Sequence, residues 1–593
     1  MLGTKALMSP IAIPTPRPLR SRFIPGVAVM AFLATALLTG GAVAQGEPEG
    51  LFVERVDVNV INVEVFVTDK EGRRVAGLGW EDFELYEDGQ PVEISNFYSA
   101  TRGDVVLQDA GAGVPLETGT ARPSAEDAAS ERPEDQRLNL LVYVDHFNLR
   151  PASRQRLLED LGAFVEDRLG QGDRVMLTGF DGSVELVQGF TEDRELLRQG
   201  IEAMSQFATG RQAEQAQRRR IMRLMLEEPL DLQTAYDFLR SYVQSVRADS
   251  KRSAVALQSV VRSMGGLPGR KALVYVSEGL PMRPGEDLYL LLQEAFTGQS
   301  LRNASIGGLS VDPIMESIRE DQGNLFRDIT REANAHQVTL YTLDARGSFG
   351  ESSLGADVGG MMPGSGNTVM DAARTMGFQE PLIMMAEATG GTSVLNTFNF
   401  DGALDSMARD FDTFYSLGYR SPHGGDGKYH KVEVRVKRPD LKVRHRTGFV
   451  DKPPVRRVED RTLASLLLGM GQNPLGVEVD FGTPEKKRRG RFVLPVLVRV
   501  PLRDLTLLPS GRVERGQLRF FVAVKDDEGT SEPHDEPYPI EIPRADVEKA
   551  RAQQLGYATQ LLIGKGVQTV AVGVWDELSG TESFVHKTIR VGK

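Results

Sequence analysis

Two kinds of hydrophobic pattern divide the chain. In the first, apolar and polar residues alternate, as from Val56 to Thr68 and from Lys428 to Val436. A period of two is typical of strands that bury one face. In the second, short apolar runs are separated by segments in which apolar residues recur every three to four positions, as in amphipathic helices. This second pattern extends over residues 137–415 and predicts a domain of mixed type.

Residues 137–415 are predicted to form an α/β domain. The run 138–144, Leu-Asn-Leu-Leu-Val-Tyr-Val, suits a central parallel strand that is covered on both faces. A helix is predicted over 151–169, with Leu157, Leu161 and Phe164 on one face. The alternation of strands and helices indicates a doubly wound parallel sheet. Its further strands are predicted at 174–180, 271–276, 338–343 and 392–395.

Smaller all-β modules are predicted on both sides of this domain. Residues 51–102 form an N-terminal β module, 416–452 a β extension and 460–593 a C-terminal β-sandwich-like domain. Residues 103–136 are rich in Ala, Gly, Pro and acidic residues without periodicity, which predicts a flexible linker. The Gly-, Ser- and Met-rich segment 347–367 follows a predicted strand and is interpreted as a mobile lid or as a segment without function.

The first 44 residues match a secretory signal peptide. Four basic residues precede the apolar run 24–38, and Ala42-Val43-Ala44 gives a small-x-small cleavage pattern. We expect cleavage after Ala44 and a secreted or periplasmic protein. The apolar run is shorter than the ~20 residues of a spanning helix, so stable membrane insertion after cleavage is not expected. An uncleaved membrane anchor is the alternative.

The charge and the cysteine content narrow the range of possible partners and chemistries. The net charge of −12 becomes −16 once the signal, with four basic and no acidic residues, is removed. A nucleic acid or an anionic lipid surface needs a basic protein surface, so neither is expected as the main partner. The chain has no cysteine, which excludes disulfides, thiolate catalysis and iron–sulfur clusters.

Four predicted strands of the α/β domain are followed by a carboxylate: Asp145, Asp181, Glu278 and Asp344. Ligands of doubly wound sheets bind beyond the carboxyl ends of the strands. Oxygen atoms gathered at one edge suit a hard cation such as Mg²⁺ or Ca²⁺. The alternative is that these acids cap the helices that follow them.

Catalytic and charged motifs add little evidence about the function. The chain has no G-x-S-x-G elbow, no phosphate-binding P-loop and, among its seven histidines, no H-E-x-x-H motif. His146 stands beside Asp145 and could act as a base, but no nucleophile accompanies it, and a packed or solvent-facing histidine is favoured. The basic run 218–220 is predicted to lie on a solvated helix face, as charge runs usually do.

Three stretches of the chain carry a family likeness: residues 63–78 with 81–89, residues 140–145 with 267–279, and residues 415–419 with 426–437 and 443–449. Taken in order, they resemble the bacterial VWFA-related domain proteins, a secreted family related to von Willebrand factor A domains. The resemblance covers about residues 51–452 and does not include the chain after about 460. It implies a parallel sheet flanked by helices.

The resemblance also implies a metal-ion-dependent adhesion site, built from a D-x-S-x-S loop, a threonine and the aspartate of a T-D-G turn. Asp145 matches the loop, Phe147 and Leu149 occupy its serine positions, and Asn148 offers an oxygen out of register. Glu278, in Ser-Glu-Gly, stands where T-D-G is expected. The residual metal ligands implied are Asp145, Asn148 and Glu278, and the loss of two oxygen ligands predicts a degenerate site with no required cofactor.

We therefore predict an exported, non-enzymatic protein that binds or assembles with a protein partner through an A-like domain. One alternative is a metal-dependent adhesin that uses Mg²⁺ or Ca²⁺ at Asp145, Asn148 and Glu278. A second alternative is a hydrolase of envelope polymers.

Overall fold

The computed structural model describes two compact units, one within Phe52–Arg457 and one within Val458–Lys593. The predicted signal peptide lies outside the described residues, as do nearly all of the proposed lid and residues 110–136 of the proposed linker. No helix of the described part is long and apolar enough to cross a bilayer. The described residues are 60–101, 104–109, 137–168, 172–227, 232–296, 305–306, 309–310, 312–347, 366–397, 399–526 and 529–592.

A six-stranded sheet in the order β13-β12-β9-β6-β7-β8 forms the centre of the first unit. Every neighbouring pair is parallel except β7 and β8, so the predicted doubly wound sheet is confirmed. All residues of β6 and β9 are buried, as their apolar runs require. The strands are β6 (Leu138–Asp145), β7 (Arg174–Phe180), β8 (Val184–Thr191), β9 (Arg270–Ser277), β12 (Val338–Asp344) and β13 (Ser393–Val394).

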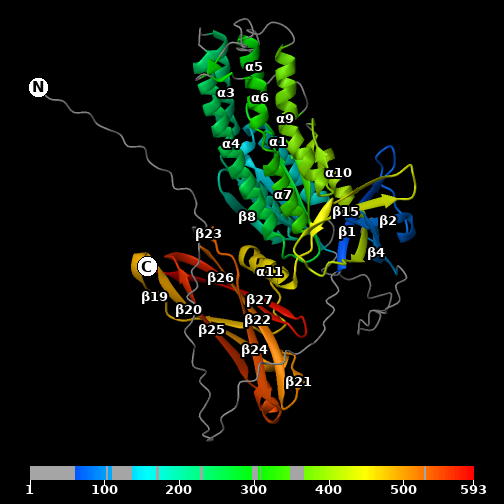
Figure 1. Cartoon of the computed structure of the whole chain (residues 1–593), viewed down its shortest axis with the longest axis vertical. Coiled ribbons are helices and arrows are strands. Elements are labelled where there is room, and N and C mark those ends of the chain that lie inside the picture. Colours follow the sequence, from blue (N-terminus) through cyan, green and yellow to red (C-terminus); the bar gives the residue numbers. More distant parts are fainter. Residues whose placement is uncertain are drawn as a thin grey trace, which may run out of the picture. The chain divides into compact units, whose positions relative to one another are not determined.

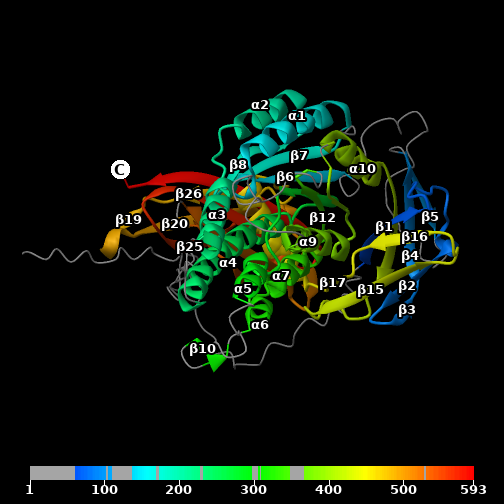
Figure 2. The same cartoon turned by 90° about the horizontal axis from the view of Figure 1, so that it is seen from above.

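Helices cover both faces of this sheet (Figure 2). On one face, α1 (Pro151–Arg168), α2 (Arg194–Met204) and α10 (Phe400–Asp412) share one hydrophobic core with the strands. On the other face lie α4 (Leu232–Ser263), α7 (Gly323–Ala335) and α9 (Gly366–Ala388). The two layers of helices bury the apolar runs that marked the central strands in the sequence.

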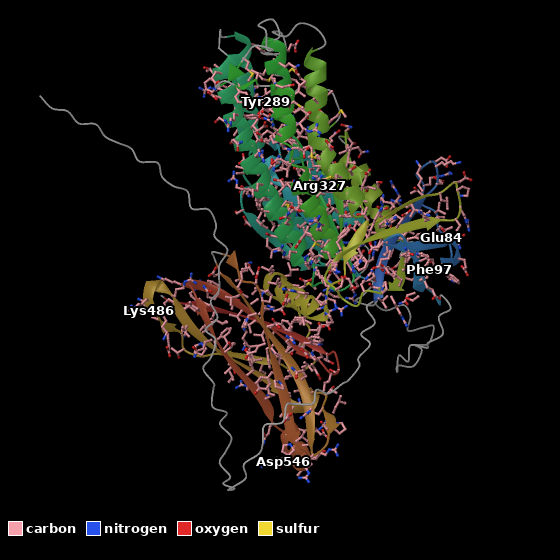
Figure 3. The ribbon with its side chains drawn as sticks, viewed as in Figure 1. Glu84, Phe97, Tyr289, Arg327, Lys486 and Asp546 are labelled. Atoms are coloured by element: carbon pink, nitrogen blue, oxygen red, sulfur yellow. The ribbon has the colours of Figure 1, made fainter. Side chains whose placement is uncertain are left out.

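A helical extension has a core of its own beyond the sheet. Figure 1 shows α3, α4, α5, α6 and α9 packed side by side at the top of the view, and Figure 3 places Tyr289 among them. A short hairpin follows α5. The bounds not yet given are α3 (Arg211–Glu227), α5 (Glu286–Phe296), α6 (Pro313–Arg319), β10 (Ser305–Ile306) and β11 (Leu309–Ser310).

Arg218 corrects one prediction about this extension. Its side chain is 2% exposed, and its Nε atom donates to Oδ2 of Asp287 at 2.6 Å. The basic run 218–220 is therefore not wholly solvated: Arg218 is buried, Arg219 half-buried and Arg220 exposed. The reason is that α5 brings a buried acid against α3, which no local pattern indicates.

The predicted N-terminal β module and the β extension form one module. Strand β1 pairs with β14, and β2 pairs with β15, both antiparallel, around a common core. Its sheets have the orders β16-β1-β14-β4-β5 and β17-β15-β2-β3. The strands are β1 (Val60–Thr68), β2 (Phe83–Glu87), β3 (Gln90–Val92), β4 (Ile94–Thr101), β5 (Asp104–Asp109), β14 (Thr413–Arg420), β15 (Tyr429–Val436), β16 (Lys442–His445) and β17 (Gly448–Val450).

Strand β5 corrects the predicted start of the linker. Residues Asp104–Asp109 pair with β4, so the flexible segment expected from residue 103 does not begin there. The physical reason is the apolar run Val-Val-Leu inside this strand, which extends the sheet by one edge strand.

The second unit contains two antiparallel sheets that enclose one apolar core. Helix α11 (Pro454–Leu468) leads into it, and Leu466 packs against Ala523 and Ala571. The remaining elements are α12 (Val547–Arg551), β18 (Glu478–Phe481), β19 (Glu485–Lys486), β20 (Phe492–Pro501), β21 (Leu508–Ser510), β22 (Val513–Asp526), β23 (Gly529–Thr530), β24 (His534–Pro543), β25 (Gln554–Ile563), β26 (Gly566–Asp576) and β27 (Glu582–Val591).

Candidate functional site at the carboxyl edge of the sheet

Asp145 ends β6 and caps the short helical turn His146–Asn148. Its side chain is fully buried, and burial raises the pKa of the carboxyl group. Oδ1 accepts a hydrogen bond from the backbone N–H of Asn148 at 3.2 Å. Oδ2 accepts from Nδ2 of Asn148 at 2.8 Å and from the hydroxyl of Tyr275 at 2.7 Å. Both oxygens of Asp145 are thus occupied by donors from the protein itself.

Glu278 follows β9 and is 2% exposed. Its Oε1 atom accepts hydrogen bonds from the backbone N–H of Arg150 at 3.0 Å, from Nε of Arg150 at 2.9 Å and from the hydroxyl of Ser153 at 2.9 Å. Nε of Arg211 lies 3.9 Å from Oε2. The negative charge of Glu278 is therefore balanced by guanidinium groups.

The structure brings the three predicted ligands into two linked loops. The backbone N–H of Glu278 donates to the carbonyl of Asn148 at 3.1 Å, which ties the loop after β6 to the loop after β9. Nδ2 of Asn148 also donates to the hydroxyl of Ser253 at 3.0 Å. Sequence reasoning missed Ser253, because it lies in the long helix α4 without any motif around it.

The two residues at the serine positions of the adhesion loop pack instead of offering oxygen. Leu149 is fully buried in the core beneath the sheet edge. The ring of Phe147 meets Phe180 edge-on at 6.2 Å, and the guanidinium of Arg252 lies 5.4 Å from its centroid. Both positions therefore contribute to the stability of the loop and not to a coordination shell.

Hydrogen-bond donors lie against the oxygens that these residues would offer to a divalent cation. Mg²⁺ requires a near-octahedral shell of oxygens, whereas hydrogen-bond donors surround the carboxylates of Asp145 and Glu278. A third strand-end acid, Asp344, is likewise bound by the guanidinium of Arg346 at 2.7 Å and by Nε2 of Gln379 at 2.9 Å. The fourth, Asp181, lies half-buried in the turn between β7 and β8.

His146 is packed, in agreement with the favoured interpretation of the sequence. Its ring has no exposed surface and stacks on Phe207 with 4.5 Å between centroids. Burial lowers its pKa to about 3, and neither ring nitrogen makes a hydrogen bond to any of the described residues. A histidine in this environment stays neutral and does not reach a substrate.

A second group of polar residues lies in the β module and was not predicted. Glu87, His423 and His430 each offer one ligand atom, and these atoms lie within 4.8 Å of one another. The residues come from β2, from the turn after β14 and from β15, so no spacing in the sequence indicates the group.

Comparisons with known proteins find solved structures that are only distantly similar to this chain. No family model and no curated protein matches the chain. An aerotolerance-related membrane protein from Bacteroides fragilis has 9% identity over 46% of this chain and 98% of its own, with a TM-score of 0.22. The vWF domain of the type V pili tip protein Mfa5 from Porphyromonas gingivalis has 12% identity over 46% and 95%, with a TM-score of 0.20.

A third similar structure is proximal thread matrix protein 1 from the mussel byssus, with a zinc-occupied MIDAS motif. It has 8% identity over 48% of this chain, with a TM-score of 0.22, and this chain spans 49% of its length. Scores at this level carry no argument about function. The strand order and the helices on both faces define a von Willebrand factor A-like α/β fold joined to antiparallel β modules.

Proposed function

We propose that this is an exported, non-enzymatic protein that binds or assembles with a protein partner through its A-like domain. In this proposal the adhesion site is degenerate, and partner binding needs no cation. The observation that carries the proposal is the contact between Glu278 and Arg150, because a guanidinium fills the role that a cation would have beside this carboxylate.

The pairing of the strand-end residues supports a binding role over catalysis. A general base must reach the proton that it takes. Asp145 and His146 are fully enclosed, and Glu278 and Asp344 are held by arginines. The net charge of the chain, −12, supports a protein partner over a nucleic acid.

The proposal is tested with the purified protein as bait in extracts of the cell envelope of its source. Captured proteins are purified, and their Kd for the bait is measured with Mg²⁺ and with EDTA. We expect a partner whose Kd changes less than twofold between the two conditions. The same measurement with Asp145→Asn is expected to leave the Mg²⁺ independence unchanged.

Two outcomes would support the alternatives. Binding that EDTA abolishes, and that Asp145→Asn also removes, would favour the metal-dependent adhesin. Release of reducing sugar ends or of new peptide amines from envelope polymers by the purified protein would favour the hydrolase.

A further inference from the structure

Two histidines and a glutamate meet at one end of the β module. Glu87 is the last residue of β2, His423 lies in the turn between β14 and β15, and His430 is the second residue of β15. The antiparallel pairing of β2 with β15 sets Glu87 opposite Val432, which brings it near His430. The two imidazole rings stack with 3.9 Å between centroids and 14° between planes. Strands from both ends of the module thus converge on one point.

Glu87 is the feature that ordinary packing does not explain. Its side chain is buried, with 2% of the residue exposed, yet neither carboxylate oxygen has a hydrogen bond of full geometry to any of the described residues. The hydroxyl of Tyr419 lies beside this carboxylate and interacts with it. A buried carboxylate without donors costs free energy unless a positive group balances it. The nearest such groups are Nε2 of His423 at 3.4 Å and Nδ1 of His430 at 3.8 Å.

The distances suit a small four-coordinate site. Zinc bonds to nitrogen and oxygen are about 2.0–2.1 Å long, so neighbouring ligand atoms of a tetrahedral site are roughly 3.3 Å apart. Oε1 of Glu87 and Nε2 of His423 are 3.4 Å apart. Oδ2 of Asp88 completes the group, 3.9 Å from Nε2 of His423 and 2.8 Å from Nδ1 of His430.

The surroundings orient these ligands. Nε2 of His430 contacts Oδ1 of Asp426 at 3.1 Å, while its Nδ1 makes a hydrogen bond with Oδ2 of Asp88 at 2.8 Å and lies 3.8 Å from Oε1 of Glu87. A histidine that binds a metal usually donates its other N–H to a carboxylate in this way. Asp88 is fixed by the backbone N–H of Lys431, which donates to Oδ1 at 2.8 Å. The turn that carries His423 is anchored by Asp451, whose Oδ2 accepts from Ser421 and from the backbone N–H of Gly425.

We propose that Glu87, His423 and His430, with Asp88 as fourth ligand, bind Zn²⁺ or a first-row divalent cation of similar preference. Imidazole and carboxylate ligands together suit such ions. All four positions are protein side chains, as in structural sites. The ion would fasten β2 to β14 and β15, which the whole α/β domain separates in the sequence. In a chain without cysteine, it would replace the staple that a disulfide provides elsewhere.

The test is metal uptake by the purified full chain. After incubation with Zn²⁺ and dialysis, elemental analysis is expected to find one ion per chain, and the Tm is expected to rise. Co²⁺ in place of Zn²⁺ is expected to give the visible d–d absorption of a four-coordinate site. Glu87→Gln and His423→Ala are each expected to weaken Zn²⁺ binding tenfold or more. His586→Ala, at an exposed position of the second unit, is the matched control and is expected to bind as the unchanged chain does.

His423 is exposed, so His423→Ala is expected to keep the fold and to make a loss of binding interpretable. Failure of the unchanged chain to retain Zn²⁺ would overturn the proposal and leave the group as ion pairs of a protonated His430. Binding that survives both substitutions would overturn it as well. Binding lost in Asp145→Asn but kept in His423→Ala would place the cation at the sheet edge instead. Partner capture does not enter this measurement, so its result is independent of the proposed function.

Discussion

Arg150 clamps Glu278 through two donors at once: its backbone N–H lies 3.0 Å, and its Nε atom 2.9 Å, from Oε1 of the carboxylate. The same guanidinium reaches the carbonyl of Arg346 at 3.2 Å. Arg150, in the loop that follows β6, therefore holds the loops that follow β9 and β12 by hydrogen bonds. The carboxyl edge of the sheet is closed by hydrogen bonds within the chain.

Loss of this clamp is expected to destabilise the first unit. Arg150→Met leaves a buried carboxylate with one of its donors and a balancing charge removed, so the free energy of unfolding should fall by about 2–4 kcal/mol. Urea unfolding followed by circular dichroism measures the change. The double variant Arg150→Met/Glu278→Gln should lose less than the sum of the two single variants. Additive losses would contradict a direct coupling.

The loop that carries Glu278 should also be sensitive at its glycine. Gly279 has a φ of +82°, and a Cβ there would lie 2.4 Å from the carbonyl oxygen of Phe378. Gly279→Ala therefore combines backbone strain with a clash and should cost more than the 1–3 kcal/mol or so of a strained residue. Gly72→Ala is the control, because Gly72 has a φ of +80° and a Cβ there would meet no atom of the described residues within 4 Å. Equal effects on Tm would contradict the clash.

Glu214, in the helical extension, should make the free energy of unfolding depend on pH in the acid range. Burial alone would raise the pKa of Glu214, but the charges of Arg374 and Arg211 and the hydroxyl of Tyr242 outweigh burial and lower the pKa to about 2. A carboxyl group whose pKa is lowered in the folded protein stabilises the fold at pH values above its pKa in the unfolded chain, 4.5. This contribution is lost as the pH falls from there through about 2.

Acid unfolding of Glu214→Gln is therefore expected to depend less steeply on pH in that window than unfolding of the unchanged chain, as followed by circular dichroism. Its control is Glu195→Gln, in which an exposed ion pair with Arg198 is removed. Exposed pairs contribute at most about 1 kcal/mol, so the control should keep the original pH dependence. A steeper curve for Glu214→Gln would refute the assignment.

The second unit should lose stability separately from the first. Phe520 is fully buried, and its ring stacks on Tyr557 with 4.2 Å between centroids. Phe520→Ala is expected to lower the free energy of unfolding of residues 458–593 by about 3–5 kcal/mol. The chain has two tryptophans, Trp80 in the first unit and Trp575 in the second. In a Trp575→Phe background, tryptophan fluorescence comes from Trp80 and reports on unfolding of the first unit. Phe520→Ala should then cause no matching shift in this unfolding transition. An equal shift would contradict separate cores.

Particular residues show how far the sequence predicts this fold. The central strands β6 and β9 could be predicted because buried parallel strands are apolar along their whole length. Strand β8 was missed, since it is an edge strand with no fully buried residue, and its Val184 and Leu186 are exposed. The pairing of β1 with β14 was also missed, because an alternating pattern reveals a buried face but not the partner strand.

The candidate sites show the same division. The sequence by itself determined that Asp145 and Glu278 lie at one edge of the sheet, since parallel strands end on the same side. Only the tertiary structure decided that Arg150 and Ser153 donate hydrogen bonds to the carboxylate of Glu278. It also decided that the buried Arg218 pairs with Asp287. Likewise, only the tertiary structure places Glu87 beside two histidines. The period of apolar residues is a local property that records which faces are buried. The partner of a charge depends on which distant segments pack against it, and that is fixed only when the whole chain folds.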